Sequence, residues 1–370
     1  MASSLDSIVE DRPREQWVDN LRVIVIAGVI VLHAATAYLV ATAGWYYEER
    51  TTSGVWLVLL SGPALIGAMF ALGPLFLLAG WFSARSLARR GPAGFVRSRL
   101  LRLGVPLVVY VLLIDPFTAY LGGRWRTVPL GTRPMEVSVL WFVAALLVFS
   151  VVYAALRRVR PARALRRPLR TGVLAAAVAT ITVSSFAVWQ VWPANAVMFL
   201  NLRVGEWPQG AVLFALGVLG AEAGWLDELP TVLARRLGWV ATAGVAALVA
   251  LMVSLVLARG ADQALVMGAD LPTMAFALLD GLIAVSGTLW FIAWLRGRWP
   301  SHGPLLDKAA RASYATYVIH PPVLTAVMVA FAAVALAPEI KFVLVATAGA
   351  AACFTAGYAL TRVPGISKVL

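Results

Sequence analysis

Residues 21–43 read LRVIVIAGVIVLHAATAYLVATA, an apolar run with Arg22 near its start and His33 in its middle. A helix of about 20 such residues crosses a hydrocarbon core of roughly 30 Å. Similar runs recur along the chain, because 61% of the 370 residues are hydrophobic and only 13% are charged. The pattern predicts an all-α polytopic membrane protein.

Ten apolar runs predict about ten transmembrane helices. We place them at about 21–43, 55–82, 103–121, 137–156, 171–192, 208–224, 238–258, 271–295, 314–337 and 342–361. They predict one integral-membrane domain over residues 21–361, flanked by segments 1–20 and 362–370. No short apolar core with a small-residue cleavage site precedes the first run, so we expect the first span itself to direct insertion.

The positive charges lie unevenly between these spans. If the spans alternate in direction, 24 of the 31 Lys and Arg residues fall on the side of both termini and 7 on the other. Cytoplasmic loops are enriched in Lys and Arg, so both termini are predicted to be cytoplasmic. The net charge of +13 is thus interpreted as a topology signal, and no nucleic-acid partner is expected.

Arg22 and His33 are eleven residues apart, which is three helical turns plus about 20°. Both side chains therefore project from nearly one face of a helix, about 16 Å apart along its axis. Asp19 would extend this stripe if the helix starts early, or would cap the helix if it starts late. An arginine at a helix end is also a common topological anchor, and a buried histidine can simply bind a neighbouring helix.

The residue types at these positions favour a catalytic role over a purely structural one. Ionisable groups at membrane depth are costly and usually line a functional site. Histidine can abstract a proton near neutral pH, and arginine binds phosphate or carboxylate groups. A histidine base inside the membrane and an arginine at the cytoplasmic surface together fit acyl transfer from acyl-CoA to a hydroxyl.

Two further features are candidates for substrate contacts, and a third is an acid within a span. His320 follows Tyr317 and precedes Pro321, so a local break or kink is expected there, of the kind that lines cavities. A polar and aromatic cluster between residues 189 and 209, which includes Glu206, is the predicted acceptor entrance, although aromatic residues also mark membrane interfaces. Asp280 interrupts the eighth span and is expected to pair with an arginine or histidine or to be structural.

Several familiar motifs are missing from the sequence. There is no zinc-spaced histidine or cysteine cluster, no phosphate-binding loop and no dinucleotide fingerprint. A Gly-x-Ser-x-Gly elbow is also missing, which disfavours a covalent serine mechanism. We therefore expect no metal and no bound prosthetic group.

Six segments in order carry a resemblance to a known family. They are Trp17–Arg22 continuing to His33, Gly73–Ser83, Phe95–Pro106, Leu140–Phe142, Phe214–Leu226 and Ser313–Pro321. They resemble the membrane acyltransferase-3 family, and within it the branch of glucan succinyltransferases called glucan biosynthesis protein C. One departure is Ala79, where the family often has serine, so no chemistry is assigned to that position.

The resemblance implies an O-acyltransferase of the bacterial cytoplasmic membrane. It would move an acetyl, succinyl or similar group from cytoplasmic acyl-CoA, as co-substrate, to a hydroxyl of a carbohydrate or glycosylated acceptor. The implied catalytic residues are His33 as general base, Arg22 and Asp19.

The implied acyl-CoA contacts are Arg22, Arg99 and Arg102, and the implied acceptor contacts are Tyr317, His320 and Trp141. Glu206, from the polar and aromatic cluster, is a further predicted acceptor contact. Arg99 and Arg102 could also be simple positive-inside anchors. The competing hypothesis is a transporter or flippase without acyl-transfer chemistry, which paired broken helices in two repeated halves would favour. The sequence shows no such repeat.

Overall fold

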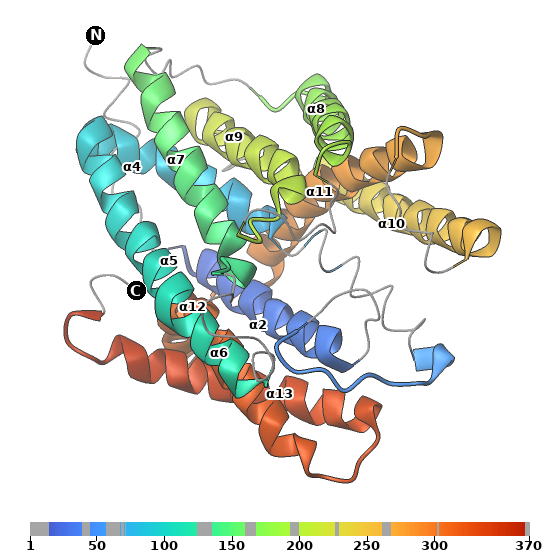
Figure 1. The fold of residues 1–370 in the computed structure, drawn as a ribbon. Coiled ribbons are helices and arrows are strands. Elements are labelled where there is room, and N and C mark those ends of the chain that lie inside the picture. Colours follow the sequence, from blue (N-terminus) through green and yellow to red (C-terminus); the bar gives the residue numbers. More distant parts are fainter. Residues whose placement is uncertain are drawn as a thin grey trace.

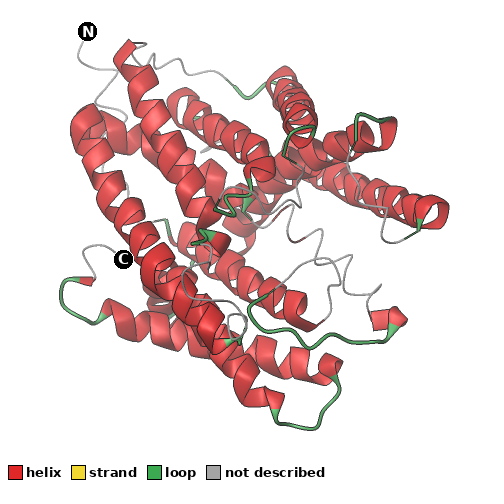
Figure 2. Cartoon of the chain, viewed as in Figure 1, coloured by secondary structure: helices red, strands yellow, loops and turns green. Residues whose placement is uncertain are grey.

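A computed structural model describes residues 15–38, 45–56, 67, 70, 72–123, 135–159, 168–192, 200–225, 229–260, 268–301 and 303–366. This part of the chain consists of helices and connecting segments, with no strand (Figure 2). Eight of its helices are long and apolar enough to cross a membrane. The chain is an all-α polytopic membrane protein, as predicted, while the cytoplasmic location of its termini stays a prediction.

Figure 1 shows the arrangement of the helices. The α-helices are α2 (Gln16–Tyr38), α4 (Gly73–Arg99), α5 (Val105–Val109), α6 (Asp115–Leu121), α7 (Trp141–Val159), α8 (Thr171–Trp189), α9 (Trp207–Ala223), α10 (Thr231–Arg259), α11 (Leu271–Arg298), α12 (Pro304–Ala332) and α13 (Pro338–Thr361). Two π-helical turns, Leu100–Gly104 and Tyr110–Ile114, link α4 to α5 and α5 to α6. Short 3₁₀ turns, Ser138–Leu140 and Val204–Glu206, lead into α7 and α9.

The segment predicted as a loop between the second and third spans, residues 83–102, is helical instead. The helical path runs from Gly73 to Leu121 and leaves helical geometry at Gly91, where φ is 68° and ψ is 170°, just before Pro92. Glycine adopts this φ without a Cβ penalty, and proline fits the first turn of the helix that follows. The loop prediction was wrong because alanine and arginine, which carry this segment, are good helix formers.

The ten predicted spans each have a helical counterpart in the described part of the chain. The break at Gly91 divides the long helical path into two counterparts, and the short α9, with 17 residues, supplies another. Several helices begin earlier than predicted, and the largest differences are at α10, which begins at Thr231, and at α12, which begins at Pro304. The apolar pattern ends where charged residues begin, and the spans were placed by that pattern. Long cationic side chains do not end a helix, so these two helices extend beyond the apolar stretch. Residues 39–43 of the first predicted span and residues 57–66, 68, 69 and 71 of the second lie outside the described residues.

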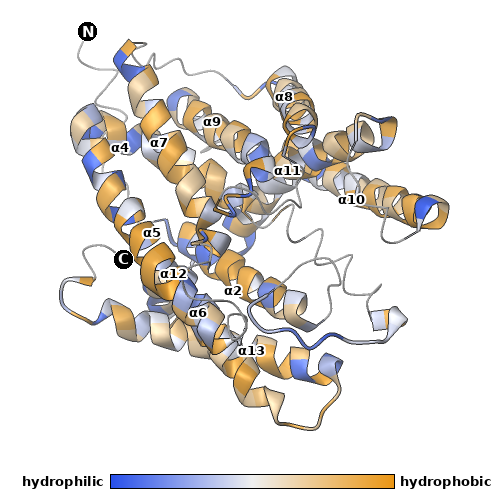
Figure 3. Cartoon of the chain, viewed as in Figure 1, coloured by the Kyte–Doolittle hydropathy of each residue, from blue (hydrophilic) through white to orange (hydrophobic). Residues whose placement is uncertain are grey.

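The outer helices contact the rest of the protein through narrow stripes. The buried residues of α10 recur every three or four positions, namely Ala234, Leu237, Ala241, Gly244 and Leu248. Its remaining surface is mostly apolar, and Figure 3 shows apolar residues along most of the length of the helices. An apolar surface of this kind is stable against lipid rather than water.

Small residues allow α4 and α9 to pack closely. A Cβ added at Gly80 would collide with the backbone carbonyl of Phe214, and one added at Gly217 would collide with that of Leu77. Glycine is common where transmembrane helices approach this closely. This contact fixes the first part of α4, and with it the position of Phe82 and Ser83.

Helix α2 lies at the centre of the bundle. It packs against α12 and α13 on one side and against α11 on another (Figure 1). Its N-terminal end is held by the side-chain amide of Asn20, which donates to the carbonyl of Trp299 at 2.9 Å, just beyond α11. The helix that carries Arg22 and His33 is therefore fixed on several sides.

Candidate active site

Two histidines from distant parts of the sequence meet at the centre of the bundle. Nδ1 of His33 on α2 lies 2.9 Å from Nε2 of His320 on α12. Their rings are nearly parallel, with centroids 5.0 Å apart and an angle of 9° between the planes. His320 is fully buried, whereas His33 is only partly buried. The residue predicted to be the base thus has a second histidine as its hydrogen-bond partner.

A proline explains the orientation of His320. Pro321 has no N–H, so the carbonyl of Tyr317, four residues earlier, lacks its usual helical donor. Nδ1 of His320 lies 2.6 Å from that carbonyl and satisfies it. Helix α12 continues from Pro304 to Ala332, so of the break or kink predicted at Pro321 the break is wrong, and the kink stays a prediction. Side chains often satisfy backbone groups freed by proline in transmembrane helices.

This chain of contacts selects one tautomer when both rings are neutral. A carbonyl only accepts, so Nδ1 of His320 carries the proton and its Nε2 is an acceptor. Nδ1 of His33 must then donate to that acceptor. The remaining nitrogen, Nε2 of His33, keeps its lone pair. His320 therefore orients His33 as a base, in the way that the third group of a catalytic triad orients its histidine.

An aromatic ring lies over both histidines. Trp45 stacks on His33 with ring centroids 4.5 Å apart, and its centroid is 6.2 Å from that of His320. The segment that carries Trp45 is tied to α13, because Nζ of Lys341 lies 2.6 Å from a carboxylate oxygen of Glu49. The sequence reasoning missed Trp45, since nothing in the sequence indicates that the connection after the first span folds back over His33.

The next residue, Tyr46, anchors the same segment to α6. Its hydroxyl donates to the carboxylate of Asp115 and lies 3.0 Å from Tyr110 and from Ser138. Burial, together with the Asp115 carboxylate, raises the pKa of Tyr46, so the phenol keeps its proton. Trp45 is thus held on a segment with two polar anchors, Tyr46 and Glu49. Asp115 is visible in the sequence as an acid within an apolar span, but its partner is not.

The predicted donor-binding arginines lie at the other end of α2. The helix begins before Asp19, which pairs with Arg22 at 3.7 Å in its first turns. The Arg22 side chain is 45% exposed and lies over the ring of Phe82, 5.7 Å from the centroid. Arg99 donates to the hydroxyl of Ser83, the residue after Phe82, at 3.0 Å. Arg22 and Arg99 therefore approach adjacent positions of α4.

The other predicted contacts are less clearly joined to this site. Arg102 is exposed, and its backbone carbonyl accepts from the hydroxyl of Tyr314 at 2.7 Å. Trp141 is partly buried, with its ring 6.2 Å from Phe76. The Tyr317 hydroxyl donates to the carbonyl of Val139, so its backbone carbonyl, rather than its hydroxyl, serves the histidine pair.

Two charged residues, Arg203 and Glu206, lie just before α9, and one of them acts on the histidine pair. Burial raises the pKa of the Glu206 carboxyl, and the charge of Arg203 opposes that shift. Arg203 also interacts electrostatically with His33. The side-chain amide of Gln209 donates to Asp280 at 3.0 Å, so the described partner of Asp280 is an amide. Within the predicted cluster at 189–209, residues 193–199 lie outside the described residues.

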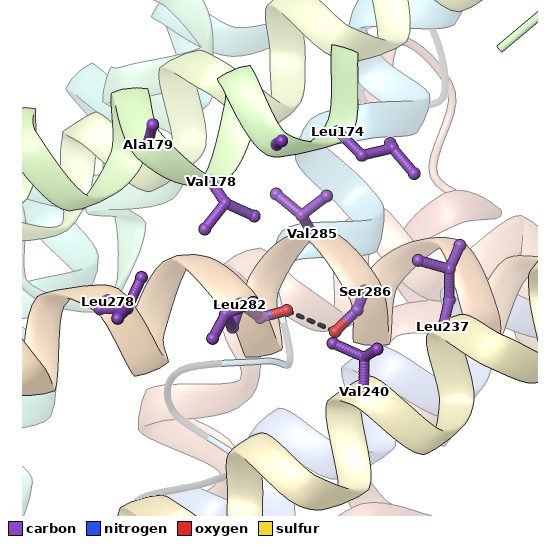
Figure 4. A pocket seen from close by; sticks show the side chains of 10 residues that line it. Leu174, Val178, Ala179, Leu237, Val240, Leu278, Leu282, Val285 and Ser286 are labelled. Atoms are coloured by element: carbon purple, nitrogen blue, oxygen red, sulfur yellow. Dashed lines mark hydrogen bonds between the residues drawn. The ribbon is translucent and has the colours of Figure 1, made fainter. Parts of the chain in front are cut away.

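A separate hollow of about 350 Å³ lies between α8, α10 and α11 (Figure 4). It is lined by Leu174, Ala175, Val178, Ala179, Leu237, Val240, Leu278, Leu282, Val285 and Ser286. The hydroxyl of Ser286 donates to the carbonyl of Leu282, so the polar atom is already paired. The hollow is an apolar surface without the groups that acyl transfer requires.

Comparisons with known proteins address the whole chain. A family model described as an acyltransferase domain matches residues 15–362. The match includes both histidines, Trp45 and the arginines on α2 and α4. Searches of curated proteins and of solved structures found no match.

Proposed function

The chain belongs to the acyltransferase-3 family of membrane proteins, and we propose that it moves an acyl group from cytoplasmic acyl-CoA to a hydroxyl group of a carbohydrate or glycosylated acceptor. The acyl group is acetyl, succinyl or similar, as the resemblance to the glucan succinyltransferase branch suggests. The observation that carries the mechanism is the chain of contacts from the Tyr317 carbonyl through His320 to His33.

In the proposed mechanism His33 acts as the general base. Its Nε2 takes the proton of the acceptor hydroxyl while the acceptor oxygen attacks the thioester carbonyl carbon. The π electrons of the carbonyl move onto its oxygen. When the carbon–sulfur bond breaks, the CoA thiolate takes the proton from His33, so no net proton is gained or lost. His320 supports the cationic ring by accepting from its Nδ1.

The donor would bind at the opposite end of α2. Arg22 lies over the ring of Phe82 and Arg99 donates to Ser83, and guanidinium groups suit the phosphates of CoA. An extended donor arm has to span about 16 Å along α2 to reach His33 from Arg22. The pantetheine chain of CoA is a long, flexible arm of this kind. The charge distribution of the loops supports a cytoplasmic donor side.

The acceptor would approach from the other side of the histidine pair. Glu206 and Arg203 lie at the start of α9, and the charge of Arg203 acts on His33. Carboxyl and guanidinium groups bind hydroxyls through several hydrogen bonds, which suits a polyhydroxylated acceptor. A carbohydrate is the acceptor class that matches these groups best.

The proposal can be tested with purified protein and acetyl-CoA or succinyl-CoA carrying a labelled acyl group. His33→Gln should lower kcat by about 10²- to 10⁴-fold, the range for loss of a general base. Arg22→Ala should mainly raise KM for acyl-CoA. Arg259→Ala is the matched control, because Arg259 pairs with Asp270 at 3.0 Å, away from α2.

Two results would contradict the proposal. Label transfer at the wild-type rate by His33→Gln would rule out the histidine base. Failure of the wild-type protein to bind any acyl-CoA would rule out the donor and favour transport of a substrate without chemistry.

A further inference from the structure

Trp45 has a polar atom that the fold leaves unused. Its side chain is 6% exposed, and its indole Nε1–H has no hydrogen-bond acceptor among the described residues. Buried indole N–H groups are normally paired, because an unpaired buried donor loses its contact with water without compensation. A donor in this state is well suited to a ligand that brings its own acceptor.

The position of this donor relates it to the proposed chemistry. The Trp45 ring stacks on His33, with ring centroids 4.5 Å apart and 22° between the planes, so the indole lies directly against one face of the proposed base. The backbone N–H of Trp45 is bonded to Glu48 at 3.3 Å, and Tyr46 packs edge-on against the indole at 5.1 Å. The indole is therefore held in place before any substrate binds.

We propose that the indole N–H of Trp45 donates a hydrogen bond to the acyl carbonyl oxygen of the donor as it becomes negative in the tetrahedral intermediate. This inference rests on the proposed acyl transfer. As the acceptor oxygen bonds to the carbonyl carbon and its proton passes to His33, the π electrons collect on the carbonyl oxygen. They return to form the carbonyl when the thiolate leaves.

The acyl oxygen is a better partner than the acceptor oxygen for an electrostatic reason. The acceptor oxygen gives its proton to His33 and shares its electron pair with carbon, so negative charge does not accumulate on it. The acyl oxygen gains the negative charge, and a fixed donor in an apolar site is most effective where charge develops. Trp45 is thereby assigned a catalytic role that is distinct from the role of His33.

The decisive variant removes only the N–H. Replacement of Trp45 by benzothienylalanine keeps the bicyclic ring and exchanges N–H for sulfur, and Trp45→Phe is the simpler companion. Loss of one such donor lowers kcat by about 10²- to 10³-fold in other enzymes, so we expect a loss of about 10²-fold with both KM values unchanged. The thermal midpoint of the benzothienylalanine protein should stay at the wild-type value, because no hydrogen bond of the free protein is lost.

Trp81→Phe is the matched control. Trp81 is 1% exposed, and its Nε1–H also lacks an acceptor among the described residues, but its ring packs at a tilt against Trp17, with centroids 6.4 Å apart, rather than on a histidine. Its kcat should stay within about twofold of wild type.

The outcomes separate this inference from the proposed function. If His33→Gln abolishes transfer and the benzothienylalanine protein keeps wild-type kcat, the role of Trp45 is wrong and the acyltransferase proposal stands. An effect confined to KM for the acceptor would also overturn the inference, since the indole would then bind the acceptor. Wild-type rates in the His33 variant would refute the proposed function itself.

Discussion

Replacing Pro321 by alanine should slow acyl transfer while leaving the fold intact. The proline leaves the Tyr317 carbonyl open to Nδ1 of His320, which lies 2.6 Å away. Alanine restores a backbone N–H that donates to the same carbonyl, four residues earlier in the helix. The restored amide therefore competes with His320 for the acceptor that fixes its tautomer.

The expected effect is moderate and can be worked out from this one contact. A hydrogen bond of this type contributes about 0.5–1.5 kcal/mol net, and about 1.4 kcal/mol corresponds to a tenfold change in rate. A carbonyl oxygen has two lone pairs, so the competition is partial. We expect kcat to fall by about two- to tenfold.

The assay is turnover of labelled acyl-CoA by purified variants, and the chain offers a close control. Pro322→Ala restores the same kind of backbone bond one residue later, where the freed carbonyl belongs to Val318 and no histidine uses it. Its kcat should equal the wild-type value. Equal rates for the two variants, whether normal or reduced, would refute the assigned role of Pro321.

Three other predictions concern stability, measured as the thermal unfolding of purified protein. Gly217→Ala should destabilise by about 1–3 kcal/mol, because its Cβ collides with a backbone carbonyl of α4, whereas Gly28→Ala on α2 meets nothing within 4 Å and should be neutral or stabilising. Equal midpoints for the two glycine variants would contradict the close packing of α4 and α9. Glu49→Ala should lower the free energy of unfolding by about 3 kcal/mol, and by more than Lys341→Met, because it leaves the ammonium group of Lys341, which is 3% exposed, without its carboxylate. The reverse order would refute that explanation. The hydroxyl and backbone N–H of Thr273 lower the pKa of the Asp270 carboxyl to about 2 from its ordinary value of 3.8. The stabilising effect of this carboxylate should therefore be complete above pH ~4 and lost as the pH falls through about 2. Asp270→Asn should remove this pH dependence.

The sequence predicted some features of the site because they depend on one helix. Arg22 and His33 share a face through helical periodicity alone, and α2 carries both. The pairing of Asp19 with Arg22 depended only on where the helix starts. The residues 83–102 were misassigned for a related reason, since hydropathy locates the apolar stretch but not the helix end.

Other features depend on packing between distant segments. His33 and His320 are 287 positions apart, and no periodicity relates α2 to α12. The fold-back of Trp45 depends on Lys341 and Asp115, which lie on α13 and α6. The bond between His320 and the Tyr317 carbonyl could have been suspected from the spacing of Tyr317, His320 and Pro321, but its connection to His33 could not.

Hydrophobic length and helical periodicity are local properties, so the amino-acid sequence was enough to predict the membrane class, the approximate spans and the shared face of Arg22 and His33. The orientation of His33 by His320 and the stacking of Trp45 over the pair emerge only in the folded protein. Those contacts arise when separate helices bury their faces against one another, and a hydrophobic pattern specifies that a face is buried without specifying its partner.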